Sequence, residues 1–481
     1  MSTGDGLLIR LSPVSGGFSP KQLIGLCESA ARHGNGIVEV TARGSCQFRG
    51  FSTMSASRFA EDVDALAIDV RTGAPVEISP LAGMDPEEIG DSVALARRIG
   101  EGIDALGLTD RLGPKVSVVV DGRGQVSRDD IVADVRLTAG KCDGHMLWRV
   151  ALAGDSGTAK LLGSYQEDGA IEAALTVLTK IAMQGQGARA RDVADDRALN
   201  QLRSTLPPSV LPDISSTRGE IGSFAQVASP APKVCESRAA GSISPLVGEM
   251  SGRTEGGNIE HKHRKPPLPD FYRLREGGYT LPISLPFGHI DAARLINLAR
   301  HAEALGIADI RPAPARTLLP ICPSLEAAQA LRKHAAKLGF VTDAVDPRRS
   351  IAACPGAPAC ASGKIAARAI AEEVARSLPP GAQNLSIHIS GCEKGCARQA
   401  AADITIVGGE NGAGLVVHGT TRARPLAYRS AAGLAEAIAA AATKLHAERR
   451  TGSAKVVDGT TAALSPAQSA CLKAAFEQDR P

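Results

Sequence analysis

The sequence is poor in aromatic residues, which make up 3% of its 481 residues and include a single tryptophan. Base stacking and aromatic-lined pockets depend on such side chains, so neither is expected to be the main binding device. An excess of one charge is also lacking, since 54 basic residues balance 51 acidic ones to a net charge of +3. Nucleic-acid-binding proteins typically carry a clear basic excess, and we therefore expect no nucleic-acid partner.

Long hydrophobic runs are missing as well, because no stretch approaches the roughly 18 apolar residues that a membrane-spanning helix needs. The first residues lack the charged and apolar segments of a signal peptide, so we expect a soluble, cytoplasmic protein with no membrane contact. The sequence has no Gly-x-Gly-x-x-Gly between a strand and a helix, and no Cys-x-x-Cys-His. We therefore expect neither a Rossmann nucleotide site nor covalently attached haem.

Four cysteines near the C-terminus carry the strongest signal in the chain. Cys354 and Cys360 form a Cys-x5-Cys pair, and Cys392 and Cys396 form a Cys-x3-Cys pair. Each iron of a 4Fe–4S cluster takes one thiolate, and two loops with two cysteines each supply the four. Glycines beside both pairs, and prolines within the first, allow the backbone to wrap closely around a cluster. The pattern favours a 4Fe–4S cluster held by these four thiolates.

Other interpretations of the four cysteines remain open at this point. Structural zinc uses similar ligands, although its pairs are usually closer, Cys-x2-4-Cys. Disulfides are a second alternative, disfavoured in a reducing cytosol, and unrelated core cysteines are a third. Most of the remaining cysteines are expected to be small buried hydrophobic residues: Cys27, Cys46, Cys142, Cys235, Cys322 and Cys471.

The chain also repeats itself. Gly16, Leu23, Leu26 and Gly34 recur at one offset as Gly288, Leu295, Leu298 and Gly306. The pattern predicts helices at Pro20–His33 and Ala292–Leu305, each preceded by a strand (Leu7–Leu11 and Tyr279–Leu285) and followed by another (Ile37–Arg43 and Ile307–Arg311). Further matches pair these strands and helices: Val116–Asp121 with Leu385–Ser390, Ala133–Leu137 with Ala402–Ile406, Trp148–Leu152 with Gly414–His418, and Ala170–Ile181 with Gly433–Leu445. The order predicts two similar halves of α+β class.

Residues 204–269 separate the halves and are rich in Gly, Ser and Pro without any visible period. This composition predicts a disordered linker or insertion. Two histidines in it, His261 and His263, are interpreted as part of a solvated polar tract, not as metal ligands.

Several cationic side chains are candidates for binding an anionic ring. Arg43, Gln47 and Arg49 cluster where a predicted strand enters a loop, and Arg311 and Arg316 occupy the equivalent segment of the second half. Arginine suits carboxylates because its fork donates two parallel hydrogen bonds. Lys115, just before another predicted strand, is a third candidate. Each of these could equally be a solvated surface charge, and their equivalent placement in both halves is what favours a functional role.

Together, these motifs resemble the sirohaem-dependent nitrite and sulfite reductase family, over everything except the linker and the tail. The resemblance rests on the Thr41–Gly50 segment, the lysine before a strand, the Ser79–Asp85 segment and the two cysteine pairs. It implies a pseudo-two-fold fold with two ferredoxin-like small domains and two mixed α/β domains around a central tetrapyrrole cleft. The expected boundaries are 1–65 and 72–198 for the first half, 270–345 and 346–450 for the second, and 451–481 for a tail.

Within this family the cysteine segments are most similar to the precorrin-3B synthase branch. That resemblance implies a monooxygenase that uses O2 and NADH-derived electrons to hydroxylate precorrin-3A at C20 with formation of a γ-lactone. It implies a 4Fe–4S cluster, a mononuclear non-haem iron and a separate NADH-dependent reductase as electron donor. In this interpretation the macrocycle's carboxylates are bound by Arg43, Gln47, Arg49, Arg311 and Arg316, and the catalytic residues are Lys115, facing the reacting side, and Arg43.

Two rival functions remain. One is an assimilatory nitrite or sulfite reductase with sirohaem as a true cofactor, and the other is a non-catalytic iron–sulfur or tetrapyrrole carrier. The mononuclear iron has no ligands that spacing can assign. His145, His388 and His418 are interpreted as packed or solvated histidines, not as its ligands.

Overall fold

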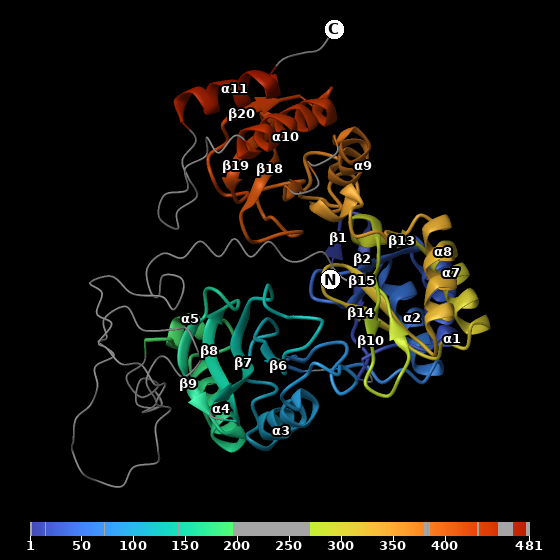
Figure 1. Cartoon of the computed structure of the whole chain (residues 1–481), viewed down its shortest axis with the longest axis vertical. Helices are drawn as coiled ribbons and strands as arrows, with labels where there is room; N and C mark the ends of the chain where they lie inside the picture. The colour runs from blue at the N-terminus through green and yellow to red at the C-terminus, as the bar shows by residue number, and fades with distance from the viewer. Residues whose placement is uncertain are drawn as a thin grey trace. The chain divides into compact units, whose positions relative to one another are not determined.

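The computed structural model describes residues 2–14, 16–71, 73–142, 144–195, 270–379, 382, 385–430, 432–450 and 465–477. The chain divides into two compact units (Figure 1). Unit 1 comprises residues 1–70 and 264–481, and unit 2 comprises residues 71–263. The expected linker, residues 204–269 with His261 and His263, lies outside the described residues.

Unit 1 begins with two antiparallel sheets that share one hydrophobic core. The first sheet has the order β1 (Ser2–Thr3), β2 (Gly6–Leu11), β4 (Cys46–Phe51), β3 (Ile37–Val40), β13 (His289–Asp291). The second contains β10 (Tyr272–Arg273), β11 (Tyr279–Thr280), β15 (Thr317–Cys322), β12 (Ile283–Ser284) and, beside β15, β14 (Ile310–Ala313). Their helices are α1 (Pro20–His33), α2 (Thr53–Ala65), α7 (Ala292–Ala304) and α8 (Leu325–Lys337), with a 3-10 turn η1 (Pro286–Gly288). The two repeats therefore fold as one body.

The two repeats exchange strand pairings reciprocally. Ile290 of the second repeat pairs with Val38 of the first, and Phe18 of the first forms a bridge with Ile310 of the second. Phe18 and Ile290 occupy equivalent positions in the repeat, as do Val38 and Ile310. This reciprocity is what a pseudo-two-fold axis between the repeats requires.

A third sheet completes unit 1 and carries both cysteine loops. Its order is β16 (Ile351–Ala353), β17 (Ile387–Ser390), β18 (Ala402–Gly409), β19 (Gly412–Gly419), β20 (Ala427–Arg429). The first three strands run parallel and the last two antiparallel. Its other elements are the 3-10 turn η2 (Pro347–Ser350), α9 (Ala367–Ser377), α10 (Leu434–Arg450) and α11 (Pro466–Glu477). The tail thus contains a helix, which packs against α10 and β20.

Unit 2 is a sheet of the same design. Its order is β5 (Val76–Glu77), β6 (Val118–Asp121), β7 (Ala133–Cys142), β8 (His145–Gly154), β9 (Lys160–Tyr165). Three parallel strands are again followed by two antiparallel ones. The helices are α3 (Ser92–Ala105), α4 (Glu167–Met183) and α5 (Ala190–Val193), labelled in Figure 1. Side chains of α3 and α4 share one hydrophobic core with Trp148. The sheet and its long helix match the repeat partner in unit 1, as expected for an α+β chain.

Several predicted strands have other bounds in the structure. In the first repeat, the strand expected at Ile37–Arg43 ends at Val40, so Arg43 lies in the turn that follows it. The expected strand Tyr279–Leu285 is interrupted at Leu281–Pro282, which separates β11 from β12, because proline has no N–H to donate to the ladder. The strand expected at Ile307–Arg311 begins later, at Ile310, and continues to Ala313. The differences at Tyr279–Leu285 and Ile307–Arg311 lie in the second repeat, which carries Arg311 and Arg316.

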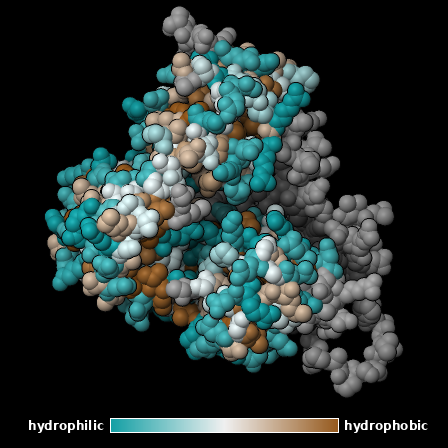
Figure 2. Space-filling view, turned by 180° about the vertical axis from the view of Figure 1, so that it is seen from behind, coloured by the Kyte–Doolittle hydropathy of each residue, from teal (hydrophilic) through white to brown (hydrophobic). Residues whose placement is uncertain are grey.

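The surface is mainly polar. Figure 2 shows one face, on which hydrophilic side chains predominate and hydrophobic ones form small groups. The most exposed large hydrophobic residues, Met183 and Met54, belong to different units. Among the described helices, none combines the length and apolar character needed to cross a membrane.

Candidate functional site

The two cysteine pairs meet because they follow neighbouring parallel strands. Cys354 comes directly after β16 and Cys392 two residues after β17, and in the register of these strands Ala353 lies opposite Ile389. The carboxyl ends of parallel strands share one edge of a sheet, so both loops start at the same place. The backbone N–H of Gly391 donates to the Sγ of Cys354 over 3.1 Å. Such a bond favours the thiolate form that metals bind.

Glycines allow the loops to pack closely. A Cβ on Gly391 would lie 2.9 Å from the Cα of Gly356 and 3.2 Å from that of Gly363, and 3.5 Å from the Cys354 sulfur. The backbone of Lys364 donates to the carbonyl of Gly391 over 2.7 Å. The Nζ of Lys394, between the second pair of cysteines, donates to the hydroxyl of Ser362 over 2.8 Å. The first and second cysteine loops are therefore joined by backbone and side-chain contacts.

All four cysteines are free thiols, which removes the disulfide alternative. Cys354 is buried, Cys360 and Cys392 are half-buried, and Cys396 is exposed. Although Cys396 is exposed as a residue, partial desolvation of its sulfur raises the pKa of its thiol. The charges of the other three cysteines raise this pKa further, so the four thiols are electrostatic neighbours. Within the described ranges, no three side chains of His, Cys, Asp or Glu are grouped closely enough to hold one metal ion. A cubane places its four thiolates on four different irons, and the donor set of two loops fits that requirement.

The turns that carry Arg43 and Arg316 lie against each other. The backbone of Ala315 donates to the carbonyl of Ala42 over 3.1 Å. Gly44 closes the first turn with a φ of +89°, and a Cβ there would lie 2.8 Å from the backbone of Ala313. Arg316 itself has a φ of +63°. Equivalent loops of the two repeats thus bring two arginines to one place in unit 1.

Arg316 also contacts the second cysteine loop. Its Nη2 donates to the carbonyl of Ala397, the residue after Cys396, over 2.6 Å. Burial lowers the pKa of Arg316 to about 10, and the like charges of Arg368 and Arg398 lower it further. Arg316 therefore lies beside the second cysteine loop, with Arg398 of that loop and Arg368 close enough to affect its charge. A buried guanidinium whose pKa is lowered by neighbouring cations is a favourable place for an anion.

Gln47 belongs to a polar row across the first sheet, with Arg10, Glu39 and His289 at successive cross-strand positions. With its amide oriented by these partners, the Gln47 oxygen accepts from Nε and Nη2 of Arg10 at 2.9 and 2.6 Å, and its nitrogen donates to Glu39 at 3.1 Å. Arg368 of α9 donates to the other oxygen of Glu39 over 2.6 Å. Gln47 is thus bound to protein groups.

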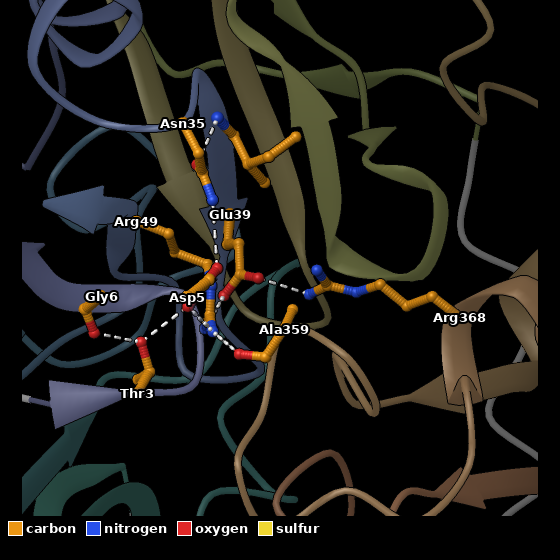
Figure 3. Close-up of polar contacts among 9 residues, drawn as sticks. Thr3, Asp5, Gly6, Asn35, Glu39, Arg49, Ala359 and Arg368 are labelled. Atoms are coloured by element: carbon orange, nitrogen blue, oxygen red, sulfur yellow. Dashed lines mark hydrogen bonds and ion pairs between the residues drawn. The ribbon is translucent and has the colours of Figure 1, made fainter.

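Arg49 is 4% exposed and directs its nitrogens to the protein (Figure 3). Its Nε and Nη2 donate to Asp5 over 2.9 and 2.8 Å, and Nη2 also donates to the carbonyl of Ala359 over 2.9 Å. Its Nη1 lies 3.7 Å from Glu39. Ala359 precedes Cys360, so Arg49 ties the first sheet to the first cysteine loop. In the structure the guanidinium of Arg49 is paired with Asp5, and its expected contact with a substrate carboxylate stays a prediction.

The other predicted site residues are placed separately. Arg311 donates through Nε to Asp309 over 2.7 Å. Lys115 is exposed in the turn before β6, in unit 2, so its expected relationship to the unit 1 residues stays a prediction. His388 is completely buried on β17, His418 lies 3.5 Å from Asp403, and His145 is exposed at the start of β8.

Sequence reasoning missed His289, whereas His388 was expected to be a packed or solvated histidine and is buried. Both lack a hydrogen-bond partner on at least one buried ring nitrogen. Burial lowers the pKa of each to about 4, helped by Arg368 for His289 and by Arg398 and Arg316 for His388. The surroundings of His289 follow from the pairing of β13 with β3, and those of His388 from the position of Arg316, so neither could be predicted from the sequence. Of the scattered cysteines, Cys27, Cys46 and Cys322 are buried as expected, Cys142 is half-buried, Cys471 is exposed, and Cys235 lies outside the described residues.

Comparison with known proteins agrees with this architecture. Residues 1–65 match the family model described as the nitrite/sulfite reductase ferredoxin-like half domain. The NirA protein of Mycobacterium tuberculosis superimposes with a TM-score of 0.64, at 15% identity, over 92% of this chain and 81% of that one. A curated protein of Sinorhizobium sp., named precorrin-3B synthase, is 32% identical over 99% of this chain and 93% of its own length.

The chain belongs to the precorrin-3B synthase family. It is accordingly an enzyme, with the nitrite/sulfite reductase-like α+β fold that the motifs indicated. The resemblance to the precorrin-3B synthase branch is confirmed, and the fold expectation is confirmed with it. For the family, the cysteine loops and the arginine turns described above are the natural candidates for cofactor and substrate contacts.

Proposed function

We propose that this chain catalyses the precorrin-3B synthase reaction, converting precorrin-3A by hydroxylation at C20 with closure of a γ-lactone by the ring A acetate. One atom of O2 enters the product, and the other leaves as water after taking up two electrons and two protons. The observation that carries the proposal is the contiguity of the Arg43 turn, the Arg316 turn and the Cys396 loop. It joins a carboxylate-binding group to a candidate cluster, as a redox enzyme acting on a polycarboxylate ring needs.

The arginines would orient the substrate. Arg43, Arg311 and Arg316 present guanidinium groups that suit carboxylates, and burial among like charges makes Arg316 the strongest attractor. Fixing the macrocycle in one pose avoids the entropic cost of encounter, which is the main catalytic contribution we assign to the protein. Gln47 and Arg49 would hold the sheet and the cysteine loop in shape instead of contacting substrate. Lys115 is proposed to face the reacting side.

The cofactors proposed are a 4Fe–4S cluster and a mononuclear non-haem iron. Cys354, Cys360, Cys392 and Cys396 would hold the cluster, which supplies electrons one at a time. The electrons would come from NADH through a separate reductase, since the sequence has no Rossmann fingerprint. Sirohaem is required only if the chain is a nitrite or sulfite reductase.

Turnover of precorrin-3A under labelled dioxygen tests the proposal. We expect one labelled oxygen atom in each product molecule, from protein that shows a broad iron–sulfur absorption without a sirohaem band. A Soret band with nitrite or sulfite reduction would make the chain a reductase, and unlabelled or absent product would refute the monooxygenase. Arg316→Met should raise the KM for precorrin-3A by about 30-fold or more, because a lost buried charge pair costs about 2–5 kcal/mol.

The cluster is tested separately. Cys354→Ser, Cys360→Ser, Cys392→Ser and Cys396→Ser should each lose inorganic sulfide and the paramagnetic signal of the reduced cluster. Cys471→Ser, at an exposed cysteine of α11, is the matched control and should keep both. Retention of sulfide in any of the four variants would remove that residue from the ligand set.

A further inference from the structure

One face of the unit 2 sheet carries polar side chains that do not belong to the core shared with α3 and α4. Side chains such as Val118, Val135 and Trp148 alternate toward the core that α3 and α4 cover. The opposite positions include Arg136, Thr138 and Arg149, together with Ser164 of β9. In the register, Thr138 pairs with Arg149 and Arg149 with Ser164, so three polar residues form one row across β7, β8 and β9.

This row contains donors that no described residue satisfies. The hydroxyl of Ser164 is buried, the residue being 5% exposed, and has no hydrogen-bond partner. Arg136 is two residues before Thr138 on β7, so it lies on the same face of the sheet, and it is 2% exposed. Its Nη2 donates to the carbonyls of Arg128 and Ile131, while its Nε and Nη1 have no hydrogen-bond partner. A buried donor without a partner costs about 1–3 kcal/mol, so a group that satisfies several of them gains that energy on binding.

Arg149 is half-buried in the middle of the row and makes no hydrogen bond or ion pair with a described residue. Burial lowers its pKa, and the like charge of Arg123 lowers it further. The carboxylates of this region act on the charge of Arg136 and Arg123: Asp121 accepts from the backbone of Arg123 over 2.9 Å, and Asp129 lies 3.6 Å from the guanidinium of Arg123. A partly desolvated guanidinium next to a second cation and a buried hydroxyl lacks only an anion.

We propose that the row Thr138–Arg149–Ser164, with Arg123 and Arg136 beside it, is a carboxylate-binding site. Resting on the proposed function, the row would bind a carboxylate of the kind that the tetrapyrrole substrate carries. Arg149 donates the charged fork, and Ser164 adds a neutral hydrogen bond. None of these residues was a candidate binding residue in the sequence analysis, because their proximity depends on the register of three strands.

The test uses uroporphyrin, a stable polycarboxylate macrocycle, whose fluorescence reports binding without turnover. Arg149→Met should weaken its binding by about 10- to 100-fold, as expected for a hydrogen bond to a charged group, and Ser164→Ala by about 5-fold. Arg149→Lys keeps the charge and should recover part of the loss. The matched control, Arg97→Met, lies on α3, where the side chain is 65% exposed, and should bind as the wild type does.

Two results would overturn the site. One is unchanged binding in both Arg149→Met and Ser164→Ala, and the other is an equal loss in Arg97→Met. If Arg149→Met unfolds, Arg149→Lys and Ser164→Ala decide, because both retain the volume and polarity of the row more closely. Wild-type protein that binds uroporphyrin through Arg149 but does not hydroxylate precorrin-3A would leave this site standing and refute the proposed function alone.

Discussion

Arg49 and Asp5 form a two-point ion pair, with Nε and Nη2 of the arginine 2.9 and 2.8 Å from the two carboxylate oxygens. The Arg49 side chain is 5% exposed and that of Asp5 is 18% exposed, so the pair is largely shielded from solvent. Arg49→Met would leave Asp5 and Glu39 as uncompensated acids. We expect unfolding in urea to show a loss of about 3–5 kcal/mol, the cost of breaking a buried pair from one side.

The control for Arg49 is an exposed pair in the same unit. Arg294 lies 3.0 Å from Asp291, and both side chains are about half exposed, so Arg294→Met should cost at most about 1 kcal/mol. Because Arg49 also holds the carbonyl of Ala359, Arg49→Met should retain less iron than Arg294→Met. Equal stability and equal iron content in the two variants would contradict a role for Arg49 in holding the cysteine loop.

Gly391→Ala tests the close packing of the cysteine loops. The added methyl group would meet backbone atoms of Gly356 and Gly363 near 3 Å, and backbone cannot turn aside as a flexible side chain can. Overpacking of this kind typically costs about 1–3 kcal/mol of folding stability. Here it should also separate the two cysteine loops, so we expect a clear loss of inorganic sulfide in protein that is still folded. Iron and sulfide counting after anaerobic purification measures the effect.

Gly100→Ala is the matched control for Gly391. A Cβ at Gly100, inside α3, would meet no atom within 4 Å. Alanine is the better helix former, so this variant should gain about 0.5–1 kcal/mol and keep the full cluster content. If Gly391→Ala also keeps its sulfide, the contact between the two loops is not needed to hold the cluster.

Local signals allowed the sequence to predict some elements to the residue. The helix Pro20–His33 was predicted with the bounds it has in the structure. Ser19 caps it, Gln22 completes a capping box, and proline occupies its first turn. The cysteine spacing indicated two loops that the structure joins through Gly391 and Cys354, and their role as cluster ligands stays a prediction.

Partners that come together only through tertiary structure could not be predicted. Asp5 stands in a short turn near the N-terminus, and nothing in its surroundings indicates that it pairs with Arg49. The same holds for His289, which faces Glu39 only because β13 crosses to the sheet of the other repeat. In the second repeat, Pro282 divides a strand that hydrophobic pattern alone suggested was continuous.

His289 should make folding stability depend on pH. Burial, with the charge of Arg368, lowers its pKa from 6.5 to about 4 in the folded state. Between these values the unfolded chain binds a proton that the folded chain does not, so stability rises with pH from about 4 and is complete above 6.5. The contribution is about 3 kcal/mol, at 1.36 kcal/mol per unit of pKa.

Urea unfolding at pH 4.5 and pH 7 measures this difference in wild type and in His289→Gln. The variant should lose less stability on acidification than the wild type does, while His145→Gln, at an exposed position, should behave as the wild type. An unchanged pH dependence in His289→Gln would mean that this histidine is hydrated in solution.

Phe476 anchors the helical tail to the sheet that carries the cysteines. It is fully buried in the same core as Cys354, and Arg429 donates to its carbonyl over 2.9 Å. Phe476→Ala should therefore cost about 3–5 kcal/mol in urea unfolding, because it empties a large site in a packed core.

Lys473→Ala on the same helix removes a side chain that is 53% exposed and should change stability by no more than about 0.5 kcal/mol. Since one core supports both the helix and the first cysteine loop, Phe476→Ala should also release iron at lower urea concentration than Lys473→Ala does. Identical midpoints for the two variants would show that α11 does not contribute to this core.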